Sequence, residues 1–143
     1  MLPSVVNLQR KVKLDTKAFQ DFVTALVSIV EEADSRPFSV ALISDRRMAE
    51  LNRFFRGKDS TTDVLSFPSE PEEFETENAD LLGDVVISVE QAQRQAAENK
   101  LSVENEIRQL MLHGLLHLCG YDHETDSGEM NARELELRDK LGI

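Results

Sequence analysis

The stretch LMLHGLLHLCGYDH, residues 110–123, decides the fold. Its first ten residues are apolar apart from two histidines and one glycine, which predicts a helix that is buried on most sides. Gly120 suits the left-handed residue at which such a helix ends, so the chain is expected to reverse there. We expect this helix to pack on a sheet that the rest of the chain supplies.

The residues before this helix alternate between strand and helix patterns. Residues 4–12 alternate apolar and polar side chains, which predicts a strand. An apolar stripe from Phe19 to Ala33 predicts an amphipathic helix, and the run 38–43 predicts a second strand. Ser44 or Asp45 is expected to cap a further helix, which Gly57 closes.

Two more strands and three helices complete the prediction. The strands are expected at 63–67 and 82–88, separated by an acidic loop from Pro68 to Leu81. The expected helices run from the cap Ser88 to about Lys100, from the cap Ser102 to near Gly120, and from Asp126 or Glu129 to about Leu141.

This order predicts one α+β domain over residues 1–143, with a mixed four-stranded sheet and about five helices. The opening β-α-β unit predicts a right-handed parallel crossover, and the later strand pair is expected to include an antiparallel member. No apolar run reaches the length of a membrane span, and the single cysteine, Cys119, excludes an internal disulfide. We therefore expect a soluble, cytoplasmic protein without a membrane partner.

The net charge of −11 is unevenly distributed. Residues 1–66 hold ten Lys and Arg against nine Asp and Glu, whereas residues 67–143 hold six against eighteen. Nucleic-acid binders are usually basic because their affinity depends on neutralising phosphates. Any nucleic-acid site in this chain must therefore be local.

The three histidines of the chain predict a metal site. His113 and His117 are four residues apart, so a helix projects both from one face, and His123 returns to them after the turn at Gly120. Three imidazoles with an open fourth position are typical of catalytic zinc, so we expect one zinc per chain in a zincin-like site. Cys119 is expected to point away from this site, whereas Asp122 is a candidate for orienting an imidazole or assisting a water molecule.

The histidine helix also carries a polar line formed by Glu106, Gln109, His113 and His117. Polar side chains along a buried helix are costly unless they face a cleft, so we expect a cleft there. The spacing of the histidines matches that of metzincin peptidases. Gly114, however, stands where those enzymes carry the glutamate that acts as general base, which disfavours a peptidase.

Three blocks resemble the YbeY family of metal-dependent single-strand endoribonucleases that mature ribosomal RNA. They are LNRFFRGKD (51–59) running into TDVLSFP (62–68), LGDVVIS (82–88) and HGLLHLCGYDH (113–123). The resemblance implies zinc on His113, His117 and His123 and a catalytic arginine at Arg56. It also implies a cleft under residues 64–67, with Ser66 and Asp84 near the metal.

The implied substrate is single-stranded RNA, with a role in small-subunit 3′-end maturation and ribosome quality control. The implied partners are the small ribosomal subunit and its assembly factors, and DNA is not expected. Arg53, Arg56 and Lys58 form the densest basic group near any motif and suit phosphate binding. Two alternatives stay open: a zinc-binding ribosome-assembly factor with little nuclease activity, and a metzincin-like peptidase.

Overall fold

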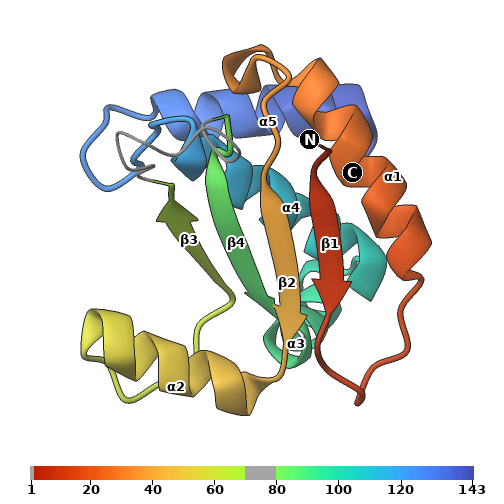
Figure 1. The fold of residues 1–143 in the computed structure, drawn as a ribbon, viewed down its shortest axis with the longest axis vertical. Coiled ribbons are helices and arrows are strands. Elements are labelled where there is room, and N and C mark those ends of the chain that lie inside the picture. The colour runs from red at the N-terminus through yellow and green to blue at the C-terminus, as the bar shows by residue number, and fades with distance from the viewer. Residues whose placement is uncertain (1, 70–79) are drawn as a thin grey trace.

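The computed structural model describes residues 2–69 and 80–143, which form an α+β fold around a mixed four-stranded sheet (Figure 1). The strands are β1 (Ser4–Asn7), β2 (Ser39–Ile43), β3 (Val64–Pro68) and β4 (Gly83–Ser88). Their order in the sheet is β1-β2-β4-β3. β1, β2 and β4 are parallel, and β3 is an antiparallel edge strand, so the predicted mixed sheet is confirmed.

The described residues form five α-helices, as predicted. They are α1 (Thr16–Ile29), α2 (Asp45–Arg56), α3 (Val89–Asn99), α4 (Val103–Leu118) and α5 (Glu129–Leu141). The predicted serine caps are confirmed, because the side chains of Ser44, Ser88 and Ser102 each accept a hydrogen bond from the backbone three residues later. Ser44 directly follows β2 and Ser88 ends β4, so α2 and α3 begin at the carboxyl ends of the two central strands.

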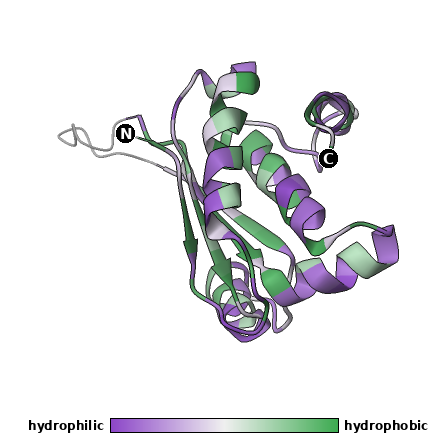
Figure 2. Cartoon of the chain, turned by 90° about the vertical axis from the view of Figure 1, so that its right-hand side faces the viewer, coloured by the Kyte–Doolittle hydropathy of each residue, from purple (hydrophilic) through white to green (hydrophobic). Residues whose placement is uncertain are grey.

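The helices divide the apolar residues into two clusters on opposite faces of the sheet. The larger cluster joins the inner face, including Val40, Val85 and Ile87, to α1 and α4. The smaller cluster, with Met48 and Val86, joins the other face to α2. Figure 2 shows most of the helices gathered on one side of the apolar strands. The helix that carries two of the histidines is thus buried in the main core, as its sequence predicted.

Two predicted boundaries are wrong. β1 ends at Asn7 rather than near residue 12, because the side-chain amide of Gln9 bonds both the N–H and the C=O of Val12 and closes a local turn. The first helix ends at Ile29, and a short 3₁₀ turn, Glu31–Ala33, continues the stripe. Residues 70–79 of the predicted acidic loop lie outside the described residues. No helix of the described part is long and apolar enough to span a membrane.

Gly114 sets the distance between α4 and the sheet. A Cβ atom at this position would lie 2.6 and 2.8 Å from the two methyl carbons of Val85 on β4, and 3.3 Å from Oγ of Ser66 on β3. Valine is stiff at χ1, so its methyl groups have little freedom to move aside. The glycine therefore allows a close approach of helix and sheet that no other residue type permits.

We expect Gly114→Ala to lower the free energy of unfolding by about 1–3 kcal/mol, the usual cost of overpacking a core. In an open helix position the same change would stabilise the protein by up to about 1 kcal/mol, so the sign is diagnostic. Urea denaturation measures the change, with Gln93→Ala on the exposed part of α3 as the control. Equal or greater stability of Gly114→Ala would show that the helix does not pack as closely as described.

Candidate metal centre and cleft

The three histidines meet at one point. Each offers one ring nitrogen, and these nitrogens lie within 4.8 Å of one another. His113 and His117 project from α4, and the chain turns back after it through Gly120, whose φ of 102° lies in the left-handed region. This turn brings His123 beside the other two rings, as the spacing predicted.

Hydrogen bonds fix which nitrogens face this point. Nδ1 of His113 lies 2.5 Å from Oε1 of Glu134, and Nδ1 of His117 lies 3.0 Å from the backbone oxygen of Tyr121. Both partners accept, so each Nδ1 carries the proton and each Nε2 is left with its lone pair. The Nε2 atoms of His113 and His117 are 3.1 Å apart, so their two lone pairs are close enough to bind the same metal ion.

The electrostatic surroundings favour the neutral, metal-binding form of His117. Burial lowers its pKa, and the neighbouring His113 and His123 lower it further. Neutral imidazole nitrogen is a ligand for zinc and similar metals, and a positive ion also relieves the crowding of three rings. The residues present therefore fit a metal ion, with the fourth side open to a cavity.

Glu134 on α5 is a residue of the site that the sequence analysis missed. Its side chain is buried, and its second oxygen accepts from Nη2 of Arg138 at 2.5 Å. Burial raises the pKa of Glu134, but the hydrogen bond with His113 and the charges of His113 and Arg138 outweigh it, so the pKa lies below its usual value. A signal existed in the sequence, because Glu134 interrupts the buried stripe of Met130 and Leu137.

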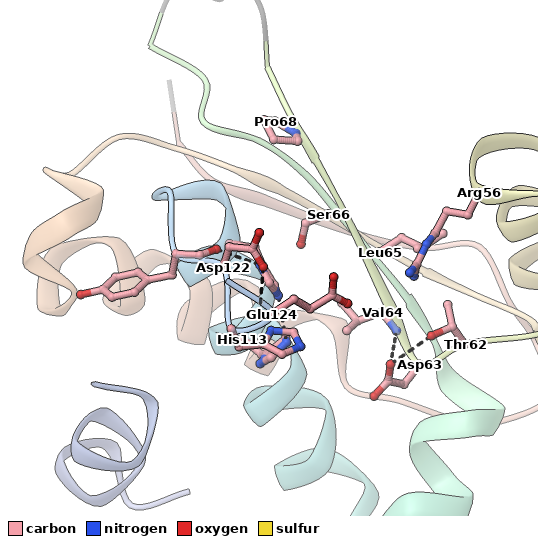
Figure 3. A pocket seen from close by; sticks show the side chains of 13 residues that line it. Arg56, Thr62, Asp63, Val64, Leu65, Ser66, Pro68, His113, Asp122 and Glu124 are labelled. Atoms are coloured by element: carbon pink, nitrogen blue, oxygen red, sulfur yellow. Dashed lines mark hydrogen bonds between the residues drawn. The ribbon is translucent and has the colours of Figure 1, made fainter. Parts of the chain in front are cut away.

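A cavity of about 570 Å³ adjoins the histidines and is open to solvent between α4, β3 and the end of α2 (Figure 3). It is lined by Arg56, Thr62, Asp63, Val64, Leu65, Ser66, Pro68, His113, His117, Tyr121, Asp122, His123 and Glu124. Arg56 and the histidines thus line one cavity, although Arg56 and His113 are 57 positions apart in the sequence. Figure 3 shows Arg56 and His113 on opposite sides of it, with residues of β3 between.

Several other predicted residues have a definite place. Ser66 lines the cavity and donates to the backbone oxygen of Gly114 at 3.2 Å. Asp122 lines it too, but its carboxylate accepts from the backbone of Glu124, and among the described residues no hydrogen bond joins it to a histidine. Arg53 and Lys58 are exposed and are not part of the described lining, so Arg56 alone of the basic group enters the cavity.

The expectation for Asp84 is wrong. Side chains alternate along a strand, and Val85 of β4 faces α4, so Asp84 faces the opposite side of the sheet. There its carboxylate accepts a hydrogen bond from Ser39 on β2. Cys119 behaves as predicted, because it packs against the core and burial raises its pKa to about 11, which keeps the thiol protonated and unsuited to a metal.

The cavity is acidic apart from Arg56. Asp63, Asp122 and Glu124 all line it, and the sequence analysis did not identify Asp63 or Glu124 as part of a site. Figure 3 shows the carboxylate of Glu124 extending into the cavity. An anionic substrate would be repelled here unless a cation were added, so these carboxylates also favour a bound metal ion.

Fold and site define the class: an α+β protein with a three-histidine site, suited to a metal ion, in an open cleft. A family model described as endoribonuclease YbeY matches residues 4–142. The chain is 43% identical to endoribonuclease YbeY of Nautilia profundicola over 133 residues, 92% of each chain. It is 47% identical to that of Solibacter usitatus over 113 residues, 79% of this chain and 71% of that one. The chain therefore belongs to the endoribonuclease YbeY family.

The fold agrees with a solved structure as well. The solution structure of TM1509 from Thermotoga maritima superimposes with a TM-score of 0.65 at 27% identity. The match covers 99% of this chain and 90% of that chain, so the α+β architecture is shared over nearly its whole length.

We expect Glu134→Gln and Glu134→Ala to weaken zinc binding by about 10- to 100-fold, the usual effect of removing a residue that orients a histidine ligand. Glutamine retains the oxygen acceptor but loses the charge, so its effect should be the smaller. Competition with a chromogenic chelator measures the affinity. Glu136→Gln and Glu136→Ala, on the exposed side of the same helix, are the controls and should bind zinc as the unmodified protein does.

Proposed function

We propose that this chain is a zinc-dependent endoribonuclease, specific for single strands, that acts in ribosomal RNA processing at the small-subunit 3′ end and in ribosome quality control. In this proposal residues 1–143 are one catalytic domain, His113, His117 and His123 hold one zinc ion, and Arg56 is the catalytic arginine. The observation that supports it is that the only arginine lining the described cavity shares it with the three histidines and lies across it from His113.

Arg56 is suited to a phosphodiester. A guanidinium stays protonated and donates two parallel hydrogen bonds to phosphate oxygens. Among residues 2–69 and 80–143, Arg56 forms no ion pair, so its donors are available to a substrate. Charge on the phosphate grows toward the transition state, and a donor already in place stabilises the transition state more than the bound substrate.

Zinc, when bound, supplies a Lewis acid that neutralises a phosphate oxygen and makes water a better nucleophile. The protein's own residues hold the geometry for this. Glu134 and the backbone oxygen of Tyr121 keep the protons on Nδ1 of His113 and His117. Ser66, bound to the backbone of α4, holds β3 at the cleft. Single-stranded RNA suits such a site because its backbone is free to enter a narrow cleft.

A peptidase is the weaker alternative. The metzincin mechanism needs a glutamate directly after the first histidine, and this chain has Gly114 there. A Cβ atom at Gly114 would already collide with Val85, so the packing leaves no room for a carboxylate side chain. The third possibility, an assembly factor that binds zinc and cuts little, is decided by the assay below.

The charge distribution supports a role for partners. The acidic half of the chain, residues 67–143, repels RNA outside the cleft. In this proposal the small ribosomal subunit and its assembly factors bring the RNA to the cleft, in the cytoplasm. No contact with DNA or with a membrane is part of the proposal.

We expect nuclease-free, zinc-loaded protein to hold one zinc per chain and to cleave single-stranded RNA but not casein. His117→Ala should lose both zinc and cleavage, because two imidazoles bind zinc poorly. Elemental analysis after dialysis and gel assays of RNA and casein provide the measurements, with Glu98→Ala, exposed on α3, as control. Zinc-dependent casein cleavage would favour the peptidase, and zinc without any cleavage would favour the assembly factor.

Arg56→Ala is expected to keep its fold and its zinc while the rate at saturating RNA falls by about 10²–10³, the scale of removing one electrostatic donor. Arg56→Lys should recover only part of the rate, because an ammonium cannot make the two-pronged contact. Single-turnover cleavage with zinc analysis and circular dichroism tests this, and Arg53→Ala is the matched control from the same helix. An Arg56→Ala variant that cuts saturating RNA at the full rate would reduce Arg56 to a docking residue.

A further inference from the structure

A second cavity adjoins the first along α4. It measures about 560 Å³, and Asp63 and His113 line both cavities. Glu106 and Gln109 of the predicted polar line face this second cavity, together with the side-chain amides of Gln95 and Asn99. The polar line of α4 therefore runs from the histidine site into the second cavity. Neither metal binding at the histidines nor phosphate binding by Arg56 explains the polar residues of this cavity.

Glu106 is the residue of this cavity that most needs a partner. Its exposure is 4%, yet within the described part of the chain no Lys, Arg or His forms an ion pair with it. Among residues 2–69 and 80–143, the only donor to its two oxygens is the amide nitrogen of Asn99, at 3.3 Å from each. A carboxylate has about four acceptor positions, and a buried charge with so few hydrogen bonds is costly. Glu106 lines the cavity and thus has acceptor capacity that its bonds with Asn99 leave unused.

The other carboxylates of the cavity are already engaged. Glu134 binds His113 and Arg138, and Asp63 accepts from the amide of Gln95 at 3.2 Å. A divalent cation needs several free oxygen ligands, which these engaged carboxylates do not supply. Arg138 also lines the cavity, but its charge is paired with that of Glu134, so the cavity as a whole is negative and repels a phosphate. The ligand that fits is an uncharged group with N–H donors, small enough for the cavity and flanked by amides.

We propose that this second cavity is a nucleobase subsite in which Glu106 accepts hydrogen bonds from the Watson–Crick edge of a guanine next to the cleaved phosphate. The inference rests on the proposed nuclease function, since it deepens the same cleft. Guanine presents two adjacent donors, N1–H and the 2-amino group, which match the two oxygens of one carboxylate. Side-chain amides such as Gln109 can donate to guanine O6.

The same chemistry ranks the other bases. Adenine and cytosine each offer one amino donor beside a ring nitrogen that accepts, so they satisfy one oxygen of Glu106 and turn a lone pair toward the other. Uracil places its single N–H between two carbonyl oxygens, which face a carboxylate unfavourably. A site built to accept from donors discriminates strongly against a base that lacks them. The expected order is guanine first, adenine and cytosine next, and uracil last.

Cleavage of a randomised single-stranded RNA pool by the zinc-loaded protein tests the subsite, with the cut ends sequenced. At one fixed position beside the cut, guanine should exceed uracil by about fivefold or more, the discrimination of a bidentate base contact. Glu106→Gln replaces one acceptor with a donor at the same volume and should abolish that preference. Glu98→Gln, exposed on α3, is the matched control and should keep it.

A uniform profile at every flanking position, or a guanine preference that Glu106→Gln leaves intact, would overturn the proposal. A binding measurement separates this failure from failure of the nuclease function. Guanosine, which lacks a phosphate, should shift the side-chain amide NMR signals of Asn99 and Gln109 in the unmodified protein and not in Glu106→Gln, whereas uridine should not. If guanosine binds in this way and RNA is not cleaved, the subsite stands and the nuclease assignment fails. If RNA is cleaved and guanosine shifts no signal, the subsite fails alone.

Discussion

The close contact between Gly114 of α4 and Val85 of β4 is the constraint on which the rest of the site depends. Because glycine has no side chain, the backbone of α4 lies near enough to the sheet for Ser66 on β3 to bond the carbonyl of Gly114. β3 is an edge strand, and its residues Val64, Leu65 and Ser66 line the open cavity. His113 and His117 lie on either side of Gly114 along α4. The cavity beside these histidines is bounded on one side by β3.

Features that depend on neighbouring residues were predictable from the sequence. The caps Ser44, Ser88 and Ser102 and the convergence of the histidines follow from spacings of three to ten residues, and helix geometry fixes them. The mixed sheet followed from the order of patterns along the chain. The link between Arg56 and the histidines needed the family resemblance, because no local rule joins residues so far apart.

Features that depend on side-chain contacts across the fold were missed or misplaced. Glu134 lies on a different helix from His113, and only the packing of α5 against α4 brings them together. Asp84 was assigned to the metal site although strand alternation, with Val85 facing the core, turns it to the other face. The early end of β1 depends on side-chain hydrogen bonds of Gln9, which no alternation of apolar residues reveals.

The acidic composition of the chain is compatible with an RNA substrate if some charged residues form structural ion pairs and others remain available to the RNA. Most arginines of the second half are held in ion pairs: Arg94 with Asp45, Arg133 with Glu32, and Arg138 with Glu134. The pairs of Arg94 and Arg133 join segments distant in sequence, whereas Arg138 and Glu134 lie one turn apart on α5. The pair with Arg133, together with the hydrogen bond from Tyr121, lowers the pKa of Glu32 to about 2.

Arginines engaged in structure are not free to attract phosphates, and within the described cavity Arg56 is the one arginine. In the proposed function, Arg56 and a metal ion on the histidines would supply the positive charge of the cleft. Carboxylates are unfavourable next to a phosphate, but they are good acceptors for the N–H groups of a base. In the proposed subsite, the acidic second cavity can therefore bind a base while it repels the sugar–phosphate backbone of the RNA. The sugar–phosphate chain is then directed toward Arg56 and the three histidines. If the proposed subsite holds a base, the negative charge of the protein helps to orient the RNA, because a phosphate placed in the second cavity would meet the carboxylates of Asp63, Glu106 and Glu134.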